Sequence, residues 1–256
     1  MLIRIADLFT RRAWAIILAL AVIAGVTAAV WGWATPIEHR LEGARHSLFS
    51  KPPSGETVIV EIDARSLAEV QAWPWPRSVH GRLVDRLRQA GARQVVFDID
   101  FTSPAADPDQ DRAFAAALAR APGLVVLPGL LENVDGHFGT RTEALPSEPL
   151  RPHVRIGTIW IRLDEDMLAR RLPHSAQIAG EQRPSLAAVL ADRPSDRRDD
   201  IILDWSIDPA AFPRISYSDV LAGRFDPAFF RGRNVLVGGT SSTMGDRFVA
   251  PTHDYI

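Results

Sequence analysis

The longest apolar stretch of the chain lies near its N-terminus. A run reading AWAIILALAVIAGVTAAVWGWA fills residues 13–34 and contains no charged residue. As a helix, which rises about 1.5 Å per residue, it would extend roughly 33 Å, enough to cross the apolar part of a bilayer. Trp14 lies at one end and Trp31 and Trp33 at the other, where indole rings favour the level of the lipid headgroups. The pattern predicts a transmembrane helix over residues 13–34.

The charges around this run predict its orientation. Residues 1–12 carry three arginines and one aspartate, whereas residues 35–45 mix both signs. Because basic residues favour the cytoplasmic side, we expect residues 1–12 in the cytoplasm and the following domain outside it. One alternative is a cleaved signal peptide, whose apolar run is shorter, about 7 to 15 residues. The other is a buried core helix, which a terminal segment apolar on all faces disfavours.

A short polar segment separates the apolar run from the first predicted strand. Apolar residues recur at helical spacing through residues 37–48, and KPPSG at residues 51–55 ends the stretch with a prolyl linker. We therefore expect a juxtamembrane stalk over residues 35–56 and an extracytoplasmic domain over residues 57–256.

The domain begins with a strand, a helix and a second strand. TVIVEID at residues 57–63 and RQVVFDI at residues 93–99 are nearly continuous apolar runs of strand length. Between them, residues 78–90 place apolar side chains on one helical face. Strands of this kind joined by a helix predict a parallel sheet covered on both faces, with a right-handed crossover.

The alternation of helical and strand patterns continues to the end of the domain. We expect an α/β fold with a mainly parallel sheet flanked by helices, to which a hairpin starting at residues 155–162 adds antiparallel strands. The other expected elements are helices at residues 109–121, 184–192 and 216–223 and strands at residues 124–127, 201–205 and 234–239.

The composition excludes several classes of partner and of catalytic mechanism. The chain has 46% hydrophobic and 23% charged residues and a net charge of -2, which is ordinary for a globular protein and disfavours nucleic acid as a partner. Lys51 is its single lysine, so mechanisms that need a lysine elsewhere are excluded. The absence of cysteine excludes thiol nucleophiles, disulfides and cysteine metal sites.

Several motifs resemble a known sensory module when they are taken together and in order. They are VEIDARSL (60–67), WPWPRSVHGRLVDRL (73–87), VVFDIDF (95–101), RRLP (170–173), FPRISYSDVLAG (212–223), FRGRNVLVGGT (230–240) and GDRF (245–248). The set is similar to the type-2 CHASE domain, an extracellular sensory domain of bacterial transmembrane signalling proteins, over about residues 37–250.

The resemblance implies a receptor of which residues 1–256 form the front part. In that family, further membrane helices and a cytoplasmic output domain follow the sensory domain. The outputs are nucleotide cyclases, phosphodiesterases or protein kinases. We therefore expect a sensory chain at the bacterial inner membrane that is not itself an enzyme and needs no cofactor. We expect it to respond to a small-molecule or protein signal as a homodimer.

Candidate signal-binding residues lie where the predicted parallel strands end. In open α/β sheets, ligands bind beyond the carboxyl ends of the strands, where Arg77 or Arg247 could pair with an anionic group. The alternative is a structural role, in which the aspartates cap helices or pair with those arginines to hold loops in place. The candidates are Asp63, Arg77, Asp98, Thr240, Asp246 and Arg247.

A second candidate function is hydrolysis of phosphate esters in the periplasm. FDIDFT at residues 97–102 is similar to the nucleophile motif of haloacid-dehalogenase-like phosphohydrolases, in which Asp98 would attack phosphorus and Asp100 would act as acid and base, with Mg²⁺. The downstream lysine of that chemistry is missing. A third possibility is an interaction domain that binds no small ligand.

Two further motifs favour structural roles. Aspartates alternate at residues 107–111 as in a Ca²⁺ loop, but Arg112 and Leu118 replace the glycine and the glutamate that such a loop needs, so an acidic helix N-terminus explains them better. The segment WPWP at residues 73–76 predicts a rigid extended turn whose tryptophans pack into the domain. The histidines show no metal-binding spacing, and we expect no metal site.

The predicted orientation can be tested with reporter fusions. Alkaline phosphatase joined near Gly55 should be active, and β-galactosidase joined there should be inactive, because the arginines of residues 1–12 hold the N-terminus in the cytoplasm. The reverse pattern of activities would contradict the orientation.

Overall fold

The computed structural model describes residues 14, 16–27, 50–70, 73–133, 141–161, 164, 168–193 and 199–240. The chain divides into two compact units, Met1–Phe49 and Ser50–Ile256. In the first unit, residues 16–27 are helical and exposed. Among the described residues, no helix has the length and apolarity needed to cross a membrane. The ends of the predicted helix at residues 13–34 lie outside the described residues, so the membrane span stays a prediction.

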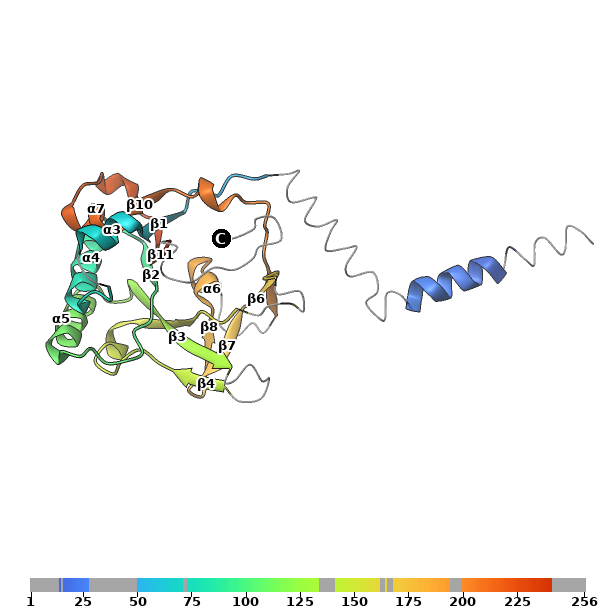
Figure 1. Ribbon diagram of the computed structural model, residues 1–256, viewed down its shortest axis with the longest axis horizontal. Helices are drawn as coiled ribbons and strands as arrows, with labels where there is room; N and C mark the ends of the chain where they lie inside the picture. The colour runs from blue at the N-terminus through green and yellow to red at the C-terminus, as the bar shows by residue number, and fades with distance from the viewer. Residues whose placement is uncertain are drawn as a thin grey trace, which may run out of the picture. The chain divides into compact units, whose positions relative to one another are not determined.

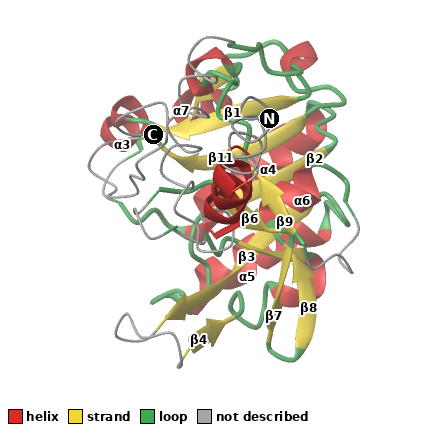
Figure 2. Cartoon of the chain, turned by 90° about the vertical axis from the view of Figure 1, so that its right-hand side faces the viewer, coloured by secondary structure: helices red, strands yellow, loops and turns green. Residues whose placement is uncertain are grey.

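The second unit is built on a seven-stranded sheet. Its strands β10, β1, β11, β2, β3 and β5 run parallel in that spatial order, and β4 pairs antiparallel with the second half of β3 (Figure 2). The expected mixed α/β fold with a mainly parallel sheet is confirmed. The strands are β1 (Thr57–Ile62), β2 (Gln94–Asp98), β3 (Val125–Asn133), β4 (Arg141–Ala144), β5 (Arg155–Thr158), β10 (Arg214–Ser216) and β11 (Asn234–Gly239).

Helices lie on both faces of the sheet but cover them unequally. Helices α4 and α5 lie on one side of the strands and α6 on the other (Figure 1), and α7 packs with α4 into the main core. The smaller α6 covers a second core around Val96 and Val126. The helices are α3 (Ala64–Glu69), α4 (Arg77–Gln89), α5 (Pro108–Ala119), α6 (Leu186–Leu190) and α7 (Tyr217–Ala222), and short 3-10 helices are η2 (Arg151–His153), η3 (Pro209–Ala211) and η4 (Pro227–Phe229).

The burial of the strands follows this unequal cover. Strand β2 is buried on both faces from Gln94 to Phe97, as its continuous apolar run predicts. Strand β1 instead alternates, because every second side chain is fully buried in the main core and the others are half-buried. The expectation of complete cover on both faces therefore holds for β2 but is wrong for β1, since α6 is too short to reach across the sheet.

The last of the described strands is an inner strand of the sheet. Strand β11 pairs with β1 over Thr57–Ile62 and with β2 over Gln94–Asp98, parallel on both sides. The connection from β1 to β2 through α3 and α4 therefore passes over β11, and the first two strands are not neighbours. This insertion determines the spacing of all the candidate residues at the carboxyl ends of the strands.

The antiparallel hairpin expected from residue 155 is wrong. Strand β5 pairs parallel with β3, and β6 (Arg171–Pro173) pairs with the distant strand β9 (Asp200–Ile202). The observed hairpin joins β7 (Ser175–Ile178) to β8 (Glu181–Pro184). Its turn residues Ala179 and Gly180 have positive φ angles of 52° and 79°, typical of the tight turns that match strand twist. Alternating polarity indicates a strand but does not specify its partner.

An aromatic cluster with a buried polar pair fills the main core between α4 and α7. The Tyr217 hydroxyl lies 2.8 Å from His80 Nδ1, and both side chains are buried. Trp75 packs 4.7 Å from the Tyr217 ring, which confirms a packing role for this tryptophan. Burial and, to a smaller extent, the charge of Arg77 lower the pKa of His80 to about 3. His80 is therefore neutral in the folded domain.

The neutral state of His80 predicts a loss of stability in acid. Its ordinary pKa is 6.5, so the unfolded chain takes up a proton between pH 6.5 and 3 that the folded domain does not. The free energy of unfolding should fall through this range by up to about 1.4 kcal/mol per pH unit from His80 alone. In His80→Gln, which cannot titrate, this component should disappear. Urea unfolding across the pH range measures it, and equal pH dependence in both proteins would contradict the assignment.

Candidate functional site

The candidate residues gather at the carboxyl edge of the parallel sheet. Asp63 follows β1, Asp98 ends β2, and Thr240 follows β11 between them, with its amide donating to the Ile62 carbonyl at 3.3 Å. Ile62 is level with Gly239 and Asp98 is level with Gly238. Because β11 separates β1 from β2, the backbones that carry the two aspartates are roughly 10 Å apart. The expected shared edge exists, but the two acids do not form a direct pair.

Asp63 caps helix α3. Its Oδ1 accepts a hydrogen bond from the Ser66 amide at 2.7 Å, the bond expected of an N-cap aspartate, and a second from the Ser216 hydroxyl at 3.0 Å. Burial alone would raise the pKa of Asp63, but the hydrogen bonds from Ser66 and Ser216 outweigh this effect and lower the pKa below its ordinary value. The Asp63 carboxylate is therefore already hydrogen-bonded within the domain.

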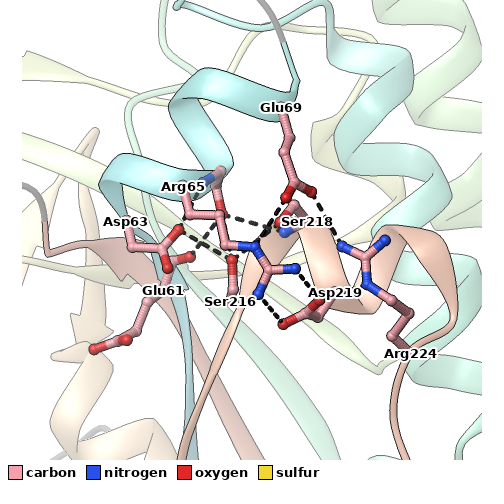
Figure 3. A network of polar contacts seen from close by, with 9 residues as sticks. Glu61, Asp63, Arg65, Glu69, Ser216, Ser218, Asp219 and Arg224 are labelled. Carbon is pink, nitrogen blue, oxygen red and sulfur yellow. Dashed lines mark hydrogen bonds and ion pairs between the residues drawn. The ribbon is translucent and has the colours of Figure 1, made fainter.

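Three buried hydroxyl groups surround this carboxylate, as Figure 3 shows in part. We call Ser66, Ser216 and Ser218 the serine cluster. The Ser216 hydroxyl is hydrogen-bonded to that of Ser66 at 2.8 Å and to that of Ser218 at 3.1 Å, and the Ser218 amide donates to Ser66 Oγ at 3.2 Å. The cluster joins α3, β10 and α7 through direct hydrogen bonds. Ser216 is the N-cap residue of α7, but its hydroxyl donates to Asp63 and not to the backbone of that helix.

Four charged side chains form a closed ring on the surface above the serine cluster (Figure 3). Asp219 accepts two hydrogen bonds from Arg65, at 2.8 and 3.0 Å, and one from Arg224, at 2.7 Å. Glu69 accepts one hydrogen bond from each of the same two arginines, at 2.8 Å from Arg65 and 3.0 Å from Arg224. Hydrogen bonds from Arg65 and then Ser218 lower the pKa of Glu69 to about 2. The ring has no net charge and ties α3 to α7.

Arg77 is also engaged within the domain. Its Nε lies 3.1 Å from Asp111 Oδ1, its guanidinium donates to the Ser103 carbonyl, and its charge lies 5.1 Å from the Phe101 ring centre. Burial lowers the pKa of Arg77, and the charge of Asp111 opposes this effect. Arg77 thus fastens the loop after β2 to α5. Asp107 caps the same helix, which confirms the structural interpretation of the acidic motif.

The exposed part of the edge lies around Gly238. Asp98 and Thr240 are exposed, and Glu61 is level with Gly238 on the opposite side of β11 from Asp98. Residues that are level in a parallel sheet point to the same face, so Gly238 places no side chain between Glu61 and Asp98. Glu61 pairs with Arg214 at 2.7 Å. Sequence reasoning missed Glu61, although a carboxylate within an otherwise apolar strand was a usable signal.

The structure does not place two of the candidate signal-binding residues. Asp246 and Arg247 lie outside the described residues. Asp100, the second aspartate of the phosphohydrolase motif, accepts a hydrogen bond from the Thr102 amide at 2.7 Å. Within the described residues, no group of three or more acidic or histidine side chains is placed to hold a metal ion.

The structural role of Asp63 can be tested by unfolding. Asp63→Ala should lower the free energy of unfolding by about 1 to 3 kcal/mol, because it removes the cap of α3 and leaves the buried Ser216 hydroxyl without its acceptor. Thr240→Ala, at the same edge but exposed, should change it by less than about 0.5 kcal/mol. Urea unfolding of both variants provides the comparison, and equal effects would contradict this assignment.

The comparisons with known proteins agree with this fold and with the sequence motifs. No curated protein matches the chain. No solved structure matches it either. The CHASE2 domain family matches residues 16–255, which include the apolar N-terminal run from Ile16, every strand of the sheet and the motif GDRF. Because this match covers nearly the whole chain, the protein belongs to the CHASE2 domain family, a family of extracellular sensory domains.

Proposed function

We propose that this chain is the membrane-anchored, extracytoplasmic sensory part of a bacterial receptor that regulates a cytoplasmic cyclase, phosphodiesterase or kinase. The observation that carries the proposal is the family match over residues 16–255. Residues 13–34 anchor the chain in the inner membrane, and the arginines of residues 1–12 hold its N-terminus in the cytoplasm. Two copies of the chain pair in the membrane.

The exposed edge around Gly238 is the place where we expect the signal to bind. Two of the candidates have structural roles, because Asp63 caps a helix and Arg77 holds a loop. Asp98 and Thr240 are exposed to solvent beside a glycine. Carboxylate and hydroxyl oxygens accept hydrogen bonds and pair with cations. A small molecule or peptide with donor or cationic groups therefore suits this edge better than the anionic ligand that Arg77 was expected to bind.

The proposal predicts that small changes at this edge alter signalling without unfolding the domain. Asp98→Asn removes a charge from an exposed side chain. Gly238→Ala adds a methyl group whose nearest neighbouring heavy atom, Asp98 Cβ, lies 3.5 Å away, which is an ordinary van der Waals contact. Both should leave thermal melting nearly unchanged. Both should shift receptor output about tenfold, equivalent to about 1.4 kcal/mol of signal binding. Output activity at matched membrane abundance measures the effect.

Asp192→Asn is a matched control for this experiment. It makes the same chemical change at an exposed carboxylate that pairs with Arg93 away from the edge, so output should stay at the wild-type level. Normal output in both edge variants would remove this edge from signalling. A Mg²⁺-dependent phosphatase activity of the chain that Asp98→Asn abolishes would replace the sensory function with hydrolysis.

A further inference from the structure

The segment that leads into the domain is bound to a loop that lies far away in the sequence. We call residues 50–56 the connecting segment and residues 203–212 the strap. The Lys51 amide donates to the Ser206 carbonyl at 2.8 Å, and Lys51 Nζ lies 3.1 Å from Asp204 Oδ2. Lys51 also forms an isolated parallel bridge with Ile207. Figure 1 shows the connecting segment, in light blue, passing near the orange strap.

The strap is attached at both of its ends. At its start, the Leu203 amide donates to the Arg170 carbonyl at 3.0 Å, and the Trp205 indole donates to the Ala169 carbonyl at 2.9 Å. At its far end, Arg214 donates to the Pro209 carbonyl at 2.5 Å and to Glu61 at 2.7 Å. The strap therefore links the β6–β9 pair to the edge of the main sheet, and the connecting segment is bound between these attachments.

The strap leads into β10, which contacts both the serine cluster and a residue beside the candidate signal site. After Pro209, the chain enters β10 at Arg214, and β10 ends at Ser216 in the serine cluster. Arg214 pairs with Glu61, which is level with Gly238 at the carboxyl edge. A displacement of this edge would therefore act on Arg214, on the strap and then on Lys51, through bonded or adjacent groups at every step.

The contact at Lys51 is well suited to reversible release. The side chains of Lys51 and Asp204 are 63% and 44% exposed, and exposed ion pairs of this kind contribute little to stability. Hydrogen bonds from Ser206 and then Lys51 lower the pKa of Asp204 to about 2, so its charge persists at any physiological pH. Movement of the strap, rather than protonation, is the event that could break the contact.

We infer that the strap is the coupling segment of this domain, through which the carboxyl edge of the sheet controls the hold on Lys51 and hence the connection to the membrane segment. The inference rests on the proposed receptor function. It assigns a regulatory role to the chain's single lysine and to Asp204. It also predicts that the two attachments of the strap are energetically coupled although Arg214 does not contact Lys51.

Hydrogen exchange of residues 1–256 in detergent tests the contact. Lys51→Met and Asp204→Asn should each speed exchange of the residue 51 amide about two- to fivefold, because the ion pair that supports its bond to Ser206 is lost. Lys51→Arg keeps the charge and should change the rate less than twofold. The amide of Val95, bonded to the Leu124 carbonyl at 2.9 Å, reports on the sheet and should not change. An unchanged rate at residue 51 in both neutral variants would overturn the inference.

A substitution at the far end of the strap tests the coupling itself. Arg214→Met removes the bonds to Pro209 and Glu61 and should also speed exchange at residue 51 about twofold or more. Unchanged protection of the Val95 amide shows that the variant is folded. If Arg214→Met leaves the residue 51 amide at the wild-type rate in the folded domain, the strap does not couple its two ends and the inference is wrong.

Receptor output separates this inference from the proposed function. Lys51→Met should shift output at matched abundance, whereas Lys51→Arg and the exposed-surface control Arg231→Met should not. A second variant, in which an unrelated domain replaces residues 57–240, serves as the comparison. If this replacement alters output but Lys51→Met does not, the coupling role is wrong. If that replacement also leaves output unchanged, the proposed sensory function itself fails.

Discussion

The pairing of β11 between β1 and β2 is the constraint on which the rest of the domain depends. Strand β11 forms parallel ladders with both neighbours over nearly its whole length. These ladders bring Val235 and Val237 into the main core and extend the sheet into one continuous layer. They also place a glycine, Gly238, between two acidic residues of the neighbouring strands. Both the core and the candidate site therefore depend on β11, the described strand that lies furthest along the sequence.

Charge is distributed unevenly around this sheet. Near α3 and α7, charged and hydroxyl side chains satisfy one another in the serine cluster and in the ring of Arg65, Glu69, Asp219 and Arg224. Such closed networks hold elements together and leave few groups for a ligand. Around Gly238, acidic and hydroxyl side chains remain at the surface. The proposed signal site lies in this second, more exposed part of the carboxyl edge.

The arrangement also places the two ends of the proposed coupling path within one small region. Strand β10 is only three residues long, yet one end meets the strap and the other meets the serine cluster. A short edge strand with few backbone bonds can shift more easily than the inner strands, which are paired on both sides. Regulation at the edge of the sheet is therefore compatible with a stable core.

The sequence alone determined the class of fold and most of its local elements. Continuous apolar runs and helical periodicity predicted β1, β2, α4 and α5, because burial imposes these patterns locally. The ordered motifs predicted the family. The aspartate at residue 63 was correctly placed at the end of a strand, and a structural cap was already an open alternative for it.

Only the tertiary structure decided which strands are neighbours and which polar groups are already bonded. No local pattern distinguishes a strand that pairs with β3 from one that begins a hairpin, so the expected hairpin at residue 155 was wrong. Asp63 and Asp98 look equivalent in sequence, since each ends an apolar strand. They differ because Ser216, more than a hundred residues away from both, bonds to one of them. Such contacts form between segments distant in the chain, and only the folded sheet brings them together.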